Sequence, residues 1–266
     1  MKKSDIIEIL YHSAMLFDKH LRNKNLLIVY GQPNAPQFIE TRATNDNFIH
    51  LTGINITDKK ITAAKFYENI LDRKVSEEDF ELKKDGTSEL KLKVLPYIME
   101  INKYSKIMGV YNNKRPKLRT DKLVGNITAS LGFILTGKYY VPNTVLNGDI
   151  RDDIEKSQRV LAILSKEVKE QNYSQIETIA KKINISDILV KISDKISIAA
   201  ELINEDTISE KNHEEKPKEC SDKSSDEPLP QNTPLFCLAD LKSEKYAPSS
   251  QKDKTKENNK SNDIEI

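Results

Sequence analysis

One histidine and a later run of cations are the residues of this sequence best suited to chemistry. His50 stands close to Thr52, within residues 47–53. Because the ordinary pKa of an imidazole lies close to neutrality, His50 can exchange a proton with a substrate at physiological pH. Cations can hold phosphate groups, arginine through paired hydrogen bonds and lysine as a point charge. The run consists of Arg115, Lys117, Arg119 and Lys122. This combination predicts a surface suited to the phosphates of nucleic acid.

The basic character is hidden in a total net charge of +1. Residues 1–204 carry 32 Lys and Arg against 26 Asp and Glu, whereas residues 205–266 carry 10 against 15. Within residues 101–138, eight cations face Asp121 as the one carboxylate. Solvated faces usually mix both signs, so this excess favours contact with nucleic acid, while a merely solvated loop remains the alternative.

The composition predicts one domain followed by a tail. A chain of 266 residues with 37% hydrophobic residues can build one good-sized core, which we expect in residues 1–204. Residues 205–266 are poor in aromatic residues and rich in charged and small polar ones, so we expect a disordered acidic tail. Its one apolar patch, residues 234–239, is a candidate docking motif for a protein partner.

Several function classes are disfavoured by what the sequence lacks. It has no apolar stretch long enough to span a membrane and no signal peptide at its start, and its two cysteines, Cys220 and Cys237, both lie in the tail. We therefore expect a cytoplasmic protein that does not bind membranes. No P-loop, G-x-S-x-G, G-x-G-x-x-G or H-E-x-x-H motif occurs, and His12 and His20 are interpreted as structural. The acidic residues 149–153 favour a helix start over a cation site. Neither a metal nor a cofactor is expected.

Hydrophobic spacing predicts helices and strands in an irregular order, which is typical of an α+β fold with N-terminal helices on a small, mainly antiparallel sheet. The predicted helices cover residues 4–22, 62–71 and 90–101, the last kinked or divided at Pro96. The predicted strands cover residues 26–30, 37–41, 48–52, 107–111, 131–136, 139–141 and 160–164. In the strand over 48–52, alternation puts His50 and Thr52 on one face.

Turn residues and a tyrosine pair complete the reading of the elements. Gly125-Asn126 and Pro142-Asn143 are assigned to turns. Tyr139 and Tyr140 are adjacent, so in a strand one faces the core and the other can stack on a base.

Four segments occur in an order that resembles one known family. They are Asn47-Phe48-Ile49-His50-Leu51-Thr52-Gly53, Lys84-Asp85-Gly86-Thr87, Thr120-Asp121-Lys122-Leu123-Val124-Gly125-Asn126 and Tyr140-Val141-Pro142-Asn143-Thr144. Over residues 20–185 the chain resembles the phage- and mobile-element-associated branch of the barnase, EndoU, colicin E5/D and RelE-like nucleases. The resemblance implies a small α+β domain with a four-stranded antiparallel sheet that acts as a metal-independent ribonuclease, with RNA as its partner.

The chemistry of such an enzyme gives the residues provisional roles. Cleavage without a metal uses the ribose 2′-hydroxyl as nucleophile and needs proton transfer and cations on the developing charge. His50 and Thr52, with Arg119 and Lys122, are the catalytic candidates, and a histidine merely hydrogen-bonded in the core is the alternative for His50. The candidates for nucleic-acid binding are Arg115, Lys117, Thr120, Asn126, Tyr140 and Thr144. Two other functions stay open: a noncatalytic nucleic-acid-binding or host-interaction protein, and a structural accessory protein whose tail recruits a partner.

Overall fold

The computed structural model describes residues 1–115 and 117–203. The predicted tail, its docking motif, His213 and both cysteines lie outside the described residues. No helix of the described chain is long and apolar enough to cross a membrane.

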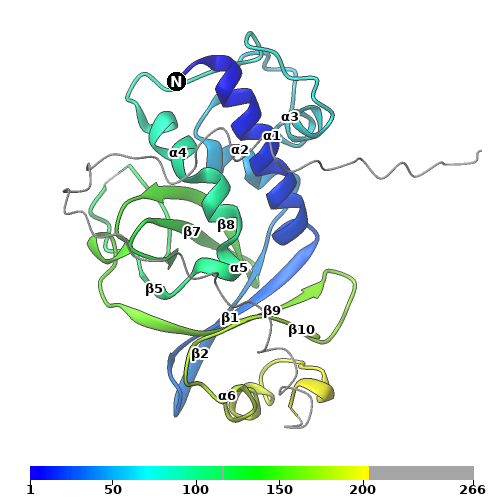
Figure 1. Ribbon diagram of the computed structural model, residues 1–266, viewed down its shortest axis with the longest axis vertical. Helices are drawn as coiled ribbons and strands as arrows, with labels where there is room; N and C mark the ends of the chain where they lie inside the picture. The colour runs from blue at the N-terminus through cyan, green and yellow to red at the C-terminus, as the bar shows by residue number, and fades with distance from the viewer. Residues whose placement is uncertain (116, 204–266) are drawn as a thin grey trace, which may run out of the picture. The chain divides into compact units, whose positions relative to one another are not determined.

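Four helices gather at one end of the sheet (Figure 1). They are α1 (Lys3–His20), α2 (Asn45–Thr52), α3 (Ala63–Leu71) and α4 (Thr87–Met99). Phe17 of α1, Phe48 of α2 and Tyr67 of α3 meet edge-on or tilted, with ring centroids 5.1–5.6 Å apart. These rings are fully buried and join three helices into one core. The short strands β3 (Asn55–Ile56) and β4 (Phe80–Glu81) pair beside this helical layer.

The predicted strand over residues 48–52 is wrong, because α2 occupies this segment. Thr44 and Asn47 form a capping box at its start, and Gly53, with a left-handed φ of 72°, ends it. The buried residues Phe48, Leu51 and Thr52 follow the helical spacing of three and four. His50 and Thr52 therefore do not share a strand face.

One mainly antiparallel sheet of eight strands forms the body of the molecule, in the order β1-β2-β8-β7-β6-β5-β9-β10. β1 also pairs with β9, so the strands β1, β2, β8, β7, β6, β5 and β9 close into a ring. β10 pairs with β9 outside this ring. A single parallel pair, Thr41 with Tyr140, joins β2 to β8. The strands are β1 (Lys24–Gln32), β2 (Ala35–Arg42), β5 (Ile107–Val110), β6 (Lys122–Gly125), β7 (Ala129–Thr136), β8 (Tyr139–Asn147), β9 (Gln158–Glu167) and β10 (Gln175–Ile179).

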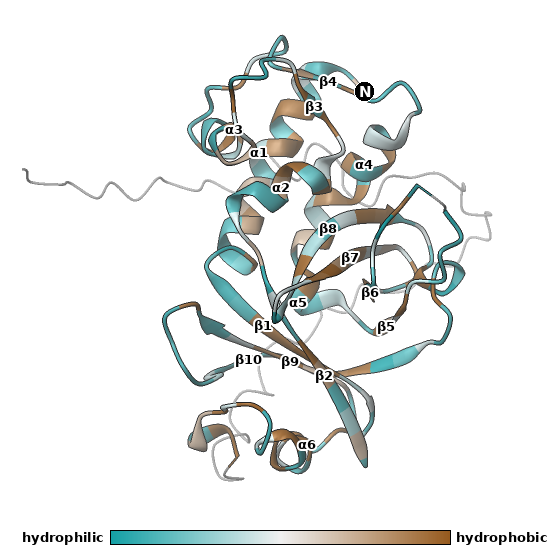
Figure 2. Cartoon of the chain, turned by 180° about the vertical axis from the view of Figure 1, so that it is seen from behind, coloured by the Kyte–Doolittle hydropathy of each residue, from teal (hydrophilic) through white to brown (hydrophobic). Residues whose placement is uncertain are grey.

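Further helices complete the chain, and hydrophobic residues follow the central strands (Figure 2). The short helix α5 (Ile101–Tyr104) follows α4, and the 3-10 helix η1 (Ile150–Asp152) follows β8. Helix α6 (Ile185–Ile192) packs through Ile188 and Leu189 on the face of β1 and β9 that presents Leu27 and Leu164. The 3-10 helix η2 (Ala200–Leu202) adds Leu202 to the same cluster.

The predicted α+β class is confirmed, with a sheet larger than the four strands that the resemblance implies. Pro96 does not divide its helix, because α4 continues through it to Met99, and a kink at this position stays a prediction. One further local prediction is wrong. Pro142-Asn143 is not a turn, because both residues lie inside β8, where a bulge between Gly132 and Phe133 of β7 shifts the register.

Candidate functional site

The two predicted catalytic residues on α2 lie in different surroundings. His50 is exposed, and within the described residues its imidazole has no hydrogen-bond or ion-pair partner. Its backbone carbonyl accepts a hydrogen bond from Lys91 Nζ at 3.1 Å. Thr52 is fully buried, where its hydroxyl donates to Ile49 O at 2.8 Å and accepts from Ile54 N at 3.2 Å. The Thr52 hydroxyl thus stabilises the end of α2.

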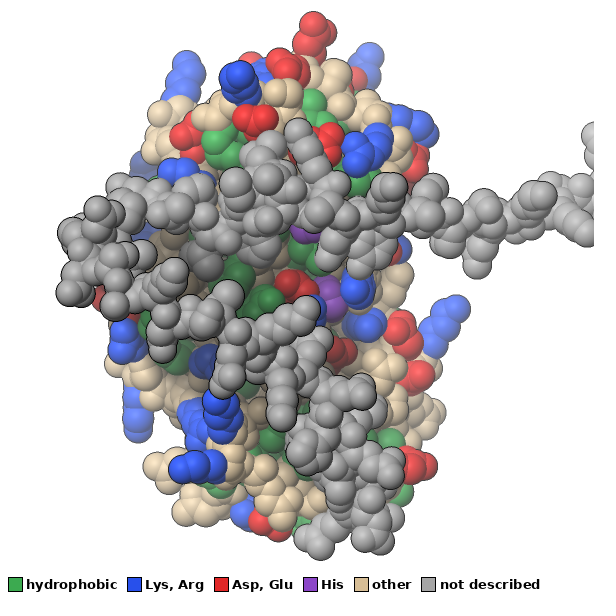
Figure 3. All heavy atoms as spheres, in the orientation of Figure 1, with side chains coloured by type: hydrophobic (Ala, Val, Ile, Leu, Met, Phe, Trp, Pro, Cys, Tyr) green, Lys and Arg blue, Asp and Glu red, His purple; other side chains and the backbone are tan. Residues whose placement is uncertain are grey.

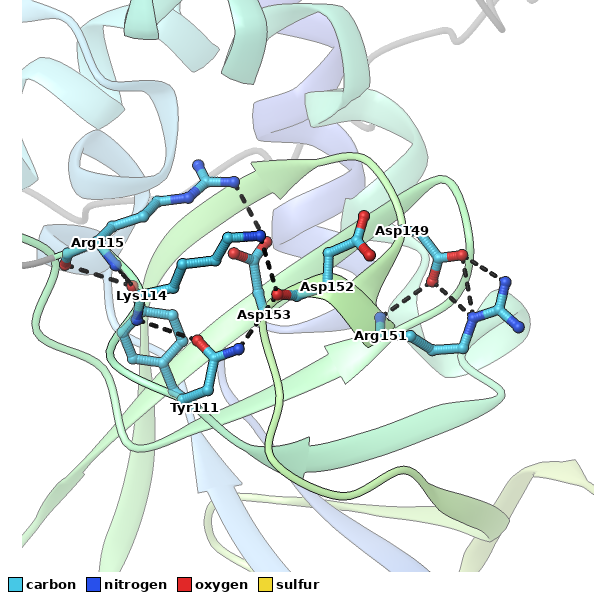
Figure 4. A network of polar contacts seen from close by, with 8 residues as sticks. Tyr111, Lys114, Arg115, Asp149, Arg151, Asp152 and Asp153 are labelled. Carbon is cyan, nitrogen blue, oxygen red and sulfur yellow. Dashed lines mark hydrogen bonds and ion pairs between the residues drawn. The ribbon is translucent and has the colours of Figure 1, made fainter.

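The loop with the predicted cations is tied to the segment around η1 (Figure 4). Arg115 forms an ion pair with the buried Asp153 at 3.2 Å, and its backbone N–H donates to Tyr111 Oη at 2.8 Å. Lys114 Nζ reaches the carbonyl of Asp152 at 3.5 Å. The fold therefore supplies a carboxylate that the local sequence lacks, which corrects the expectation that Asp121 is the only compensating one. Arg115 holds the loop in place.

The segment from Asp149 behaves as the sequence predicts. Asp149 accepts a hydrogen bond from Arg151 N at 3.0 Å and thereby caps η1 (Figure 4). Its carboxylate also pairs with the Arg151 guanidinium, and both hydrogen bonding and charge lower the pKa of Asp149. Within the described residues, no group of three or more His, Cys, Asp and Glu is placed to hold a metal ion.

Lys122 and Tyr140 are brought together on the sheet. Lys122 Nζ lies 5.9 Å from the Tyr140 ring centroid and 3.4 Å from Tyr30 Oη, so two aromatic rings surround one half-buried ammonium. Burial raises the pKa of Tyr30. Tyr139 instead lies near Arg42 and Lys138, at 5.3 and 4.9 Å from their charged groups. Tyr140 is therefore the member of the tyrosine pair that accompanies Lys122.

Two more of the predicted hydroxyl donors are buried: Thr120, in the segment before β6, and Thr144, in β8. Thr120 donates from Oγ1 to Phe133 O at 3.1 Å and lies 3.0 Å from Asn143 Oδ1. Thr144 packs against Gly132, where a Cβ atom would come within 2.5 Å of its methyl group. Thr120 therefore connects the segment before β6 to β7 and β8, and Thr144 packs β8 against β7.

Asn126 lies in the turn between β6 and β7, as the Gly125-Asn126 pair predicts. Its Oδ1 accepts from Thr128 N at 2.8 Å, and its amide donates to Tyr104 O at 3.2 Å. The Asn126 side chain therefore already closes its own turn.

Arg119 and Lys117 remain exposed, and within the described residues their side chains make no hydrogen bond or ion pair. That His50, Thr52, Arg119 and Lys122 form one catalytic group stays a prediction.

A different histidine lies in a buried polar cluster, which we call the His20 cluster: His20, Glu100, Asn102, Ser165 and Glu177. His20, the last residue of α1, is only 7% exposed, and it is interpreted from the sequence as structural. Asn102 Nδ2 lies 3.3 Å from His20 Nδ1 and 2.7 Å from Glu177 Oε2. Ser165 Oγ donates to the other oxygen of Glu177 at 2.7 Å.

These hydrogen bonds fix the state of the imidazole. Asn102 Nδ2 must donate to the Glu177 carboxylate, and its second N–H faces His20 Nδ1. Nδ1 then accepts, and the proton of the neutral ring resides on Nε2. Nε2 is buried and has no hydrogen-bond partner among residues 1–115 and 117–203, with Glu100 Oε1 at 3.7 Å. The cluster thus holds one imidazole N–H that no group in the described part of the chain satisfies.

The electrostatics of the cluster keep the imidazole neutral and Glu177 charged. Burial lowers the pKa of His20 from its ordinary 6.5, and the nearby Glu100 opposes this shift without cancelling it. Burial by itself would raise the pKa of Glu177, but hydrogen bonds from Ser165 and Asn102 outweigh it and leave that pKa below 4.5. At pH 7 the neutral His20 imidazole therefore lies among carboxylates as a hydrogen-bond donor.

Sequence reasoning missed this cluster because its members come from separate elements. His20 ends α1, Asn102 is in α5, Ser165 in β9 and Glu177 in β10. Only the pairing of β9 with β10 and the packing of α5 on β10 bring them together. The one signal in the sequence was a histidine at the end of an amphipathic helix. A histidine in this position is equally typical of a side chain that interacts favourably with the helix dipole.

A second missed group is Lys91 on α4, beside the end of α2. Burial lowers the pKa of its ammonium to about 8. A side chain at Gly53 would meet Lys91 Cδ at 2.9 Å, so this glycine leaves room for the lysine. Lys91 thereby places a partly desolvated cation next to the His50 carbonyl.

One known protein family matches most of the described residues. Neither a search of curated proteins nor a search of solved structures found a match. A family model described as phage-Barnase-EndoU-ColicinE5/D-RelE like nuclease 4 matches residues 9–182, which include every member of the His20 cluster. The predicted family resemblance is therefore confirmed at the level of the nuclease family, and the chain belongs to the phage-Barnase-EndoU-ColicinE5/D-RelE like nuclease 4 family.

Proposed function

We propose that the chain is an endoribonuclease that cleaves RNA without a metal ion, and that its reaction centre is the His20 cluster. The observation that carries the proposal is the buried His20 Nε2–H, which has no hydrogen-bond partner among the described residues and lies 3.7 Å from Glu100 Oε1. A carboxylate can accept a proton, and a buried N–H can stabilise an oxyanion. Membership of a nuclease family supplies the phosphodiester as substrate.

The reaction follows from these two groups. Glu100 accepts the proton of the ribose 2′-hydroxyl, whose oxygen forms a bond to phosphorus. His20 Nε2–H donates a hydrogen bond to a non-bridging oxygen as negative charge develops there. The bond between phosphorus and the 5′ oxygen breaks, and this oxygen leaves with a proton from water. The products are a 2′,3′-cyclic phosphate and a 5′-hydroxyl end.

The remaining cluster members position these groups. Asn102 holds the imidazole tautomer, and Glu177 and Ser165 hold Asn102. Lys103 binds Glu100 and brings positive charge near the reacting phosphate. Because Asn102 is 2% exposed and Ser165 fully buried, this support is rigid.

The experiment uses two oligonucleotides of one sequence, RNA and DNA, incubated with purified protein in EDTA. We expect the RNA to be cut to 2′,3′-cyclic phosphate ends and the DNA to stay intact, because DNA lacks the 2′-hydroxyl nucleophile. Equal cutting of both strands, or cutting that requires added Mg²⁺, would contradict the proposal.

A second candidate function is binding of nucleic acid without turnover. It is favoured by the exposed Lys117 and Arg119 and by the ammonium of Lys122 between two tyrosine rings, which need no catalytic centre. An RNA that is bound in the same EDTA buffer but recovered intact would select this alternative.

A further inference from the structure

A polar pocket of about 320 Å³ lies where the β1–β2 hairpin meets the start of β9. Among the described residues that line it, two are cations, three are carboxamides and none is a carboxylate. Its lining residues are Gly31, Gln32, Ala35, Gln37, Lys156, Ser157, Gln158 and Arg159. We propose that this pocket binds a nucleotide of single-stranded RNA that lies several nucleotides from the cleaved phosphodiester, and this proposal rests on the proposed function.

The pocket is a break in the strand pairing. β1 and β9 pair regularly until Val29, after which a bulge shifts the register, and the start of β9 pairs instead with β5 through Gln158 and Arg159. The two strands therefore diverge beside Gly31. Gly31 itself has a φ of 101°, a conformation that glycine adopts without strain.

The walls of the pocket are held in place. Arg159 donates to the carbonyl of Lys181 at 2.6 Å, and Lys191 of α6 donates to the carbonyl of Pro33 at 2.9 Å. A Cβ atom on Gly109 would come within 2.8 Å of Lys156 O, so β5 packs directly on the backbone of that wall. A preformed site loses less entropy when it binds a ligand.

Charge identifies the ligand as anionic. The Lys156 side chain is exposed and, within the described residues, makes no hydrogen bond or ion pair. The hydrogen bond from Arg159 to the Lys181 carbonyl brings the exposed Lys181 close to the pocket. The hydrogen bond from Lys191 to the Pro33 carbonyl joins α6 to the hairpin of β1 and β2. Figure 3 shows Lys and Arg side chains gathered at the lower left of this face. Cations without opposing carboxylates attract phosphate.

The carboxamides identify the rest of the ligand. Gln32, Gln37 and Gln158 each offer a donor and an acceptor, the pattern that hydrogen-bonds the edge of an unpaired base. The pocket volume lies at the lower end of the range for small-ligand sites, which suits one nucleotide. Phosphate on Lys156 and a base among the glutamines describe a segment of single-stranded RNA.

Distance separates the pocket from the reaction centre. β1 begins just after His20 and ends at Gln32, beside the pocket. At roughly 3.3 Å per residue, this strand places the two sites about 25 Å apart. The pocket therefore binds RNA several nucleotides from the scissile bond, and it acts on long substrates and not on short ones.

The test measures binding and cleavage separately. The binding probe is a fluorescein-labelled 16-nucleotide RNA with 2′-O-methyl groups, which cannot be cleaved by 2′-hydroxyl attack, and the readout is fluorescence anisotropy. We expect Lys156→Glu to weaken binding about tenfold and to lower the slope of log K against log salt by about 0.7 per lost phosphate contact. Lys59→Glu is the charge-matched control, because Lys59 is also exposed and is far from Lys156 in the sequence.

The outcomes separate this inference from the proposed function. If no RNA is cut but Lys156→Glu still weakens probe binding, the pocket stands and the reaction fails. If RNA is cut, we expect Lys156→Glu to raise the KM of a 16-nucleotide RNA and to leave a 4-nucleotide RNA unchanged. Equal binding of the RNA probe by Lys156→Glu and Lys59→Glu would overturn the proposed RNA site. Binding of AMP in the pocket, together with no effect of Lys156→Glu on binding of the RNA probe, would also overturn it.

Discussion

Asn102 Nδ2 lies 2.7 Å from Glu177 Oε2, and this contact determines what the neighbouring imidazole of His20 can do. Because the amide is committed as a donor, its other N–H faces His20 Nδ1, and the ring proton is held on Nε2. A carboxylate in β10 thus sets the tautomer of a histidine in α1.

Replacing Asn102 by leucine should release the tautomer. The side chain has a similar size but no donor, so His20 would carry its proton on either nitrogen, and the pKa of Glu177 would rise with the loss of one hydrogen bond. We expect kcat to fall by one to two orders of magnitude with little change in KM. Nitrogen chemical shifts of the imidazole report the tautomer directly, and an unchanged single tautomer in Asn102→Leu would contradict the assignment.

The stability of the protein should depend on pH through His20. Its pKa is lowered on folding, so the unfolded chain binds a proton near pH 6.5 that the folded chain binds only at lower pH. The free energy of unfolding therefore decreases as the pH falls below 6.5 and stops changing on this account below the folded-state pKa. Urea unfolding at pH 7.5 and 5.5 measures the effect. We expect a smaller decrease in His20→Gln, and an equal decrease in both proteins would exclude a buried neutral His20.

Thr52→Val should affect stability and not chemistry. The substitution removes the hydroxyl that accepts from Ile54 N in a fully buried position, which costs about 1–3 kcal/mol of unfolding free energy. We expect kcat to stay within about twofold of the parent protein below its melting temperature. A large loss of kcat in a protein of unchanged stability would instead return Thr52 to the catalytic group that the sequence predicts.

Substitutions of Arg115 and Arg119 should have different effects on stability and on RNA binding, although the two residues are close in sequence. Arg115→Ala leaves the buried Asp153 carboxylate without its partner and should cost about 1–3 kcal/mol. Arg119 is exposed, so Arg119→Ala should leave stability unchanged and reduce the salt dependence of RNA binding. Thermal unfolding and anisotropy titrations of both variants distinguish the two roles. Equal effects of the two substitutions on either measurement would contradict them.

Much of the fold could be predicted from periodicity, and the exceptions have local causes. The first helix and the hairpin of β1 and β2 were predicted because their apolar spacing is long and regular. Helix α2 was missed because its apolar residues also alternate, and the capping box at Thr44 decides between the two patterns. The closure of the sheet through β1 and β9 depends on pairing between residues far apart in the chain.

The site was predicted less well than the fold. Lys122 and Tyr140 were both chosen from the sequence, and the structure places them together. The buried Asp153 beside Arg115 and the His20 cluster were not foreseen, because each joins elements that are distant in sequence. A motif search finds residues that are neighbours in the chain, whereas these groups are neighbours only across the sheet.

The central claim is that His20, and not His50, serves the reaction. It is tested most directly by the single-turnover rate at which the parent protein, His20→Gln and His50→Gln cleave one RNA oligonucleotide in EDTA at pH 7. We expect His20→Gln to lose at least about 100-fold in rate, because the donor to the developing charge is removed, and His50→Gln to keep the parent rate. The reverse order, with His50→Gln inactive and His20→Gln fully active, would contradict the account.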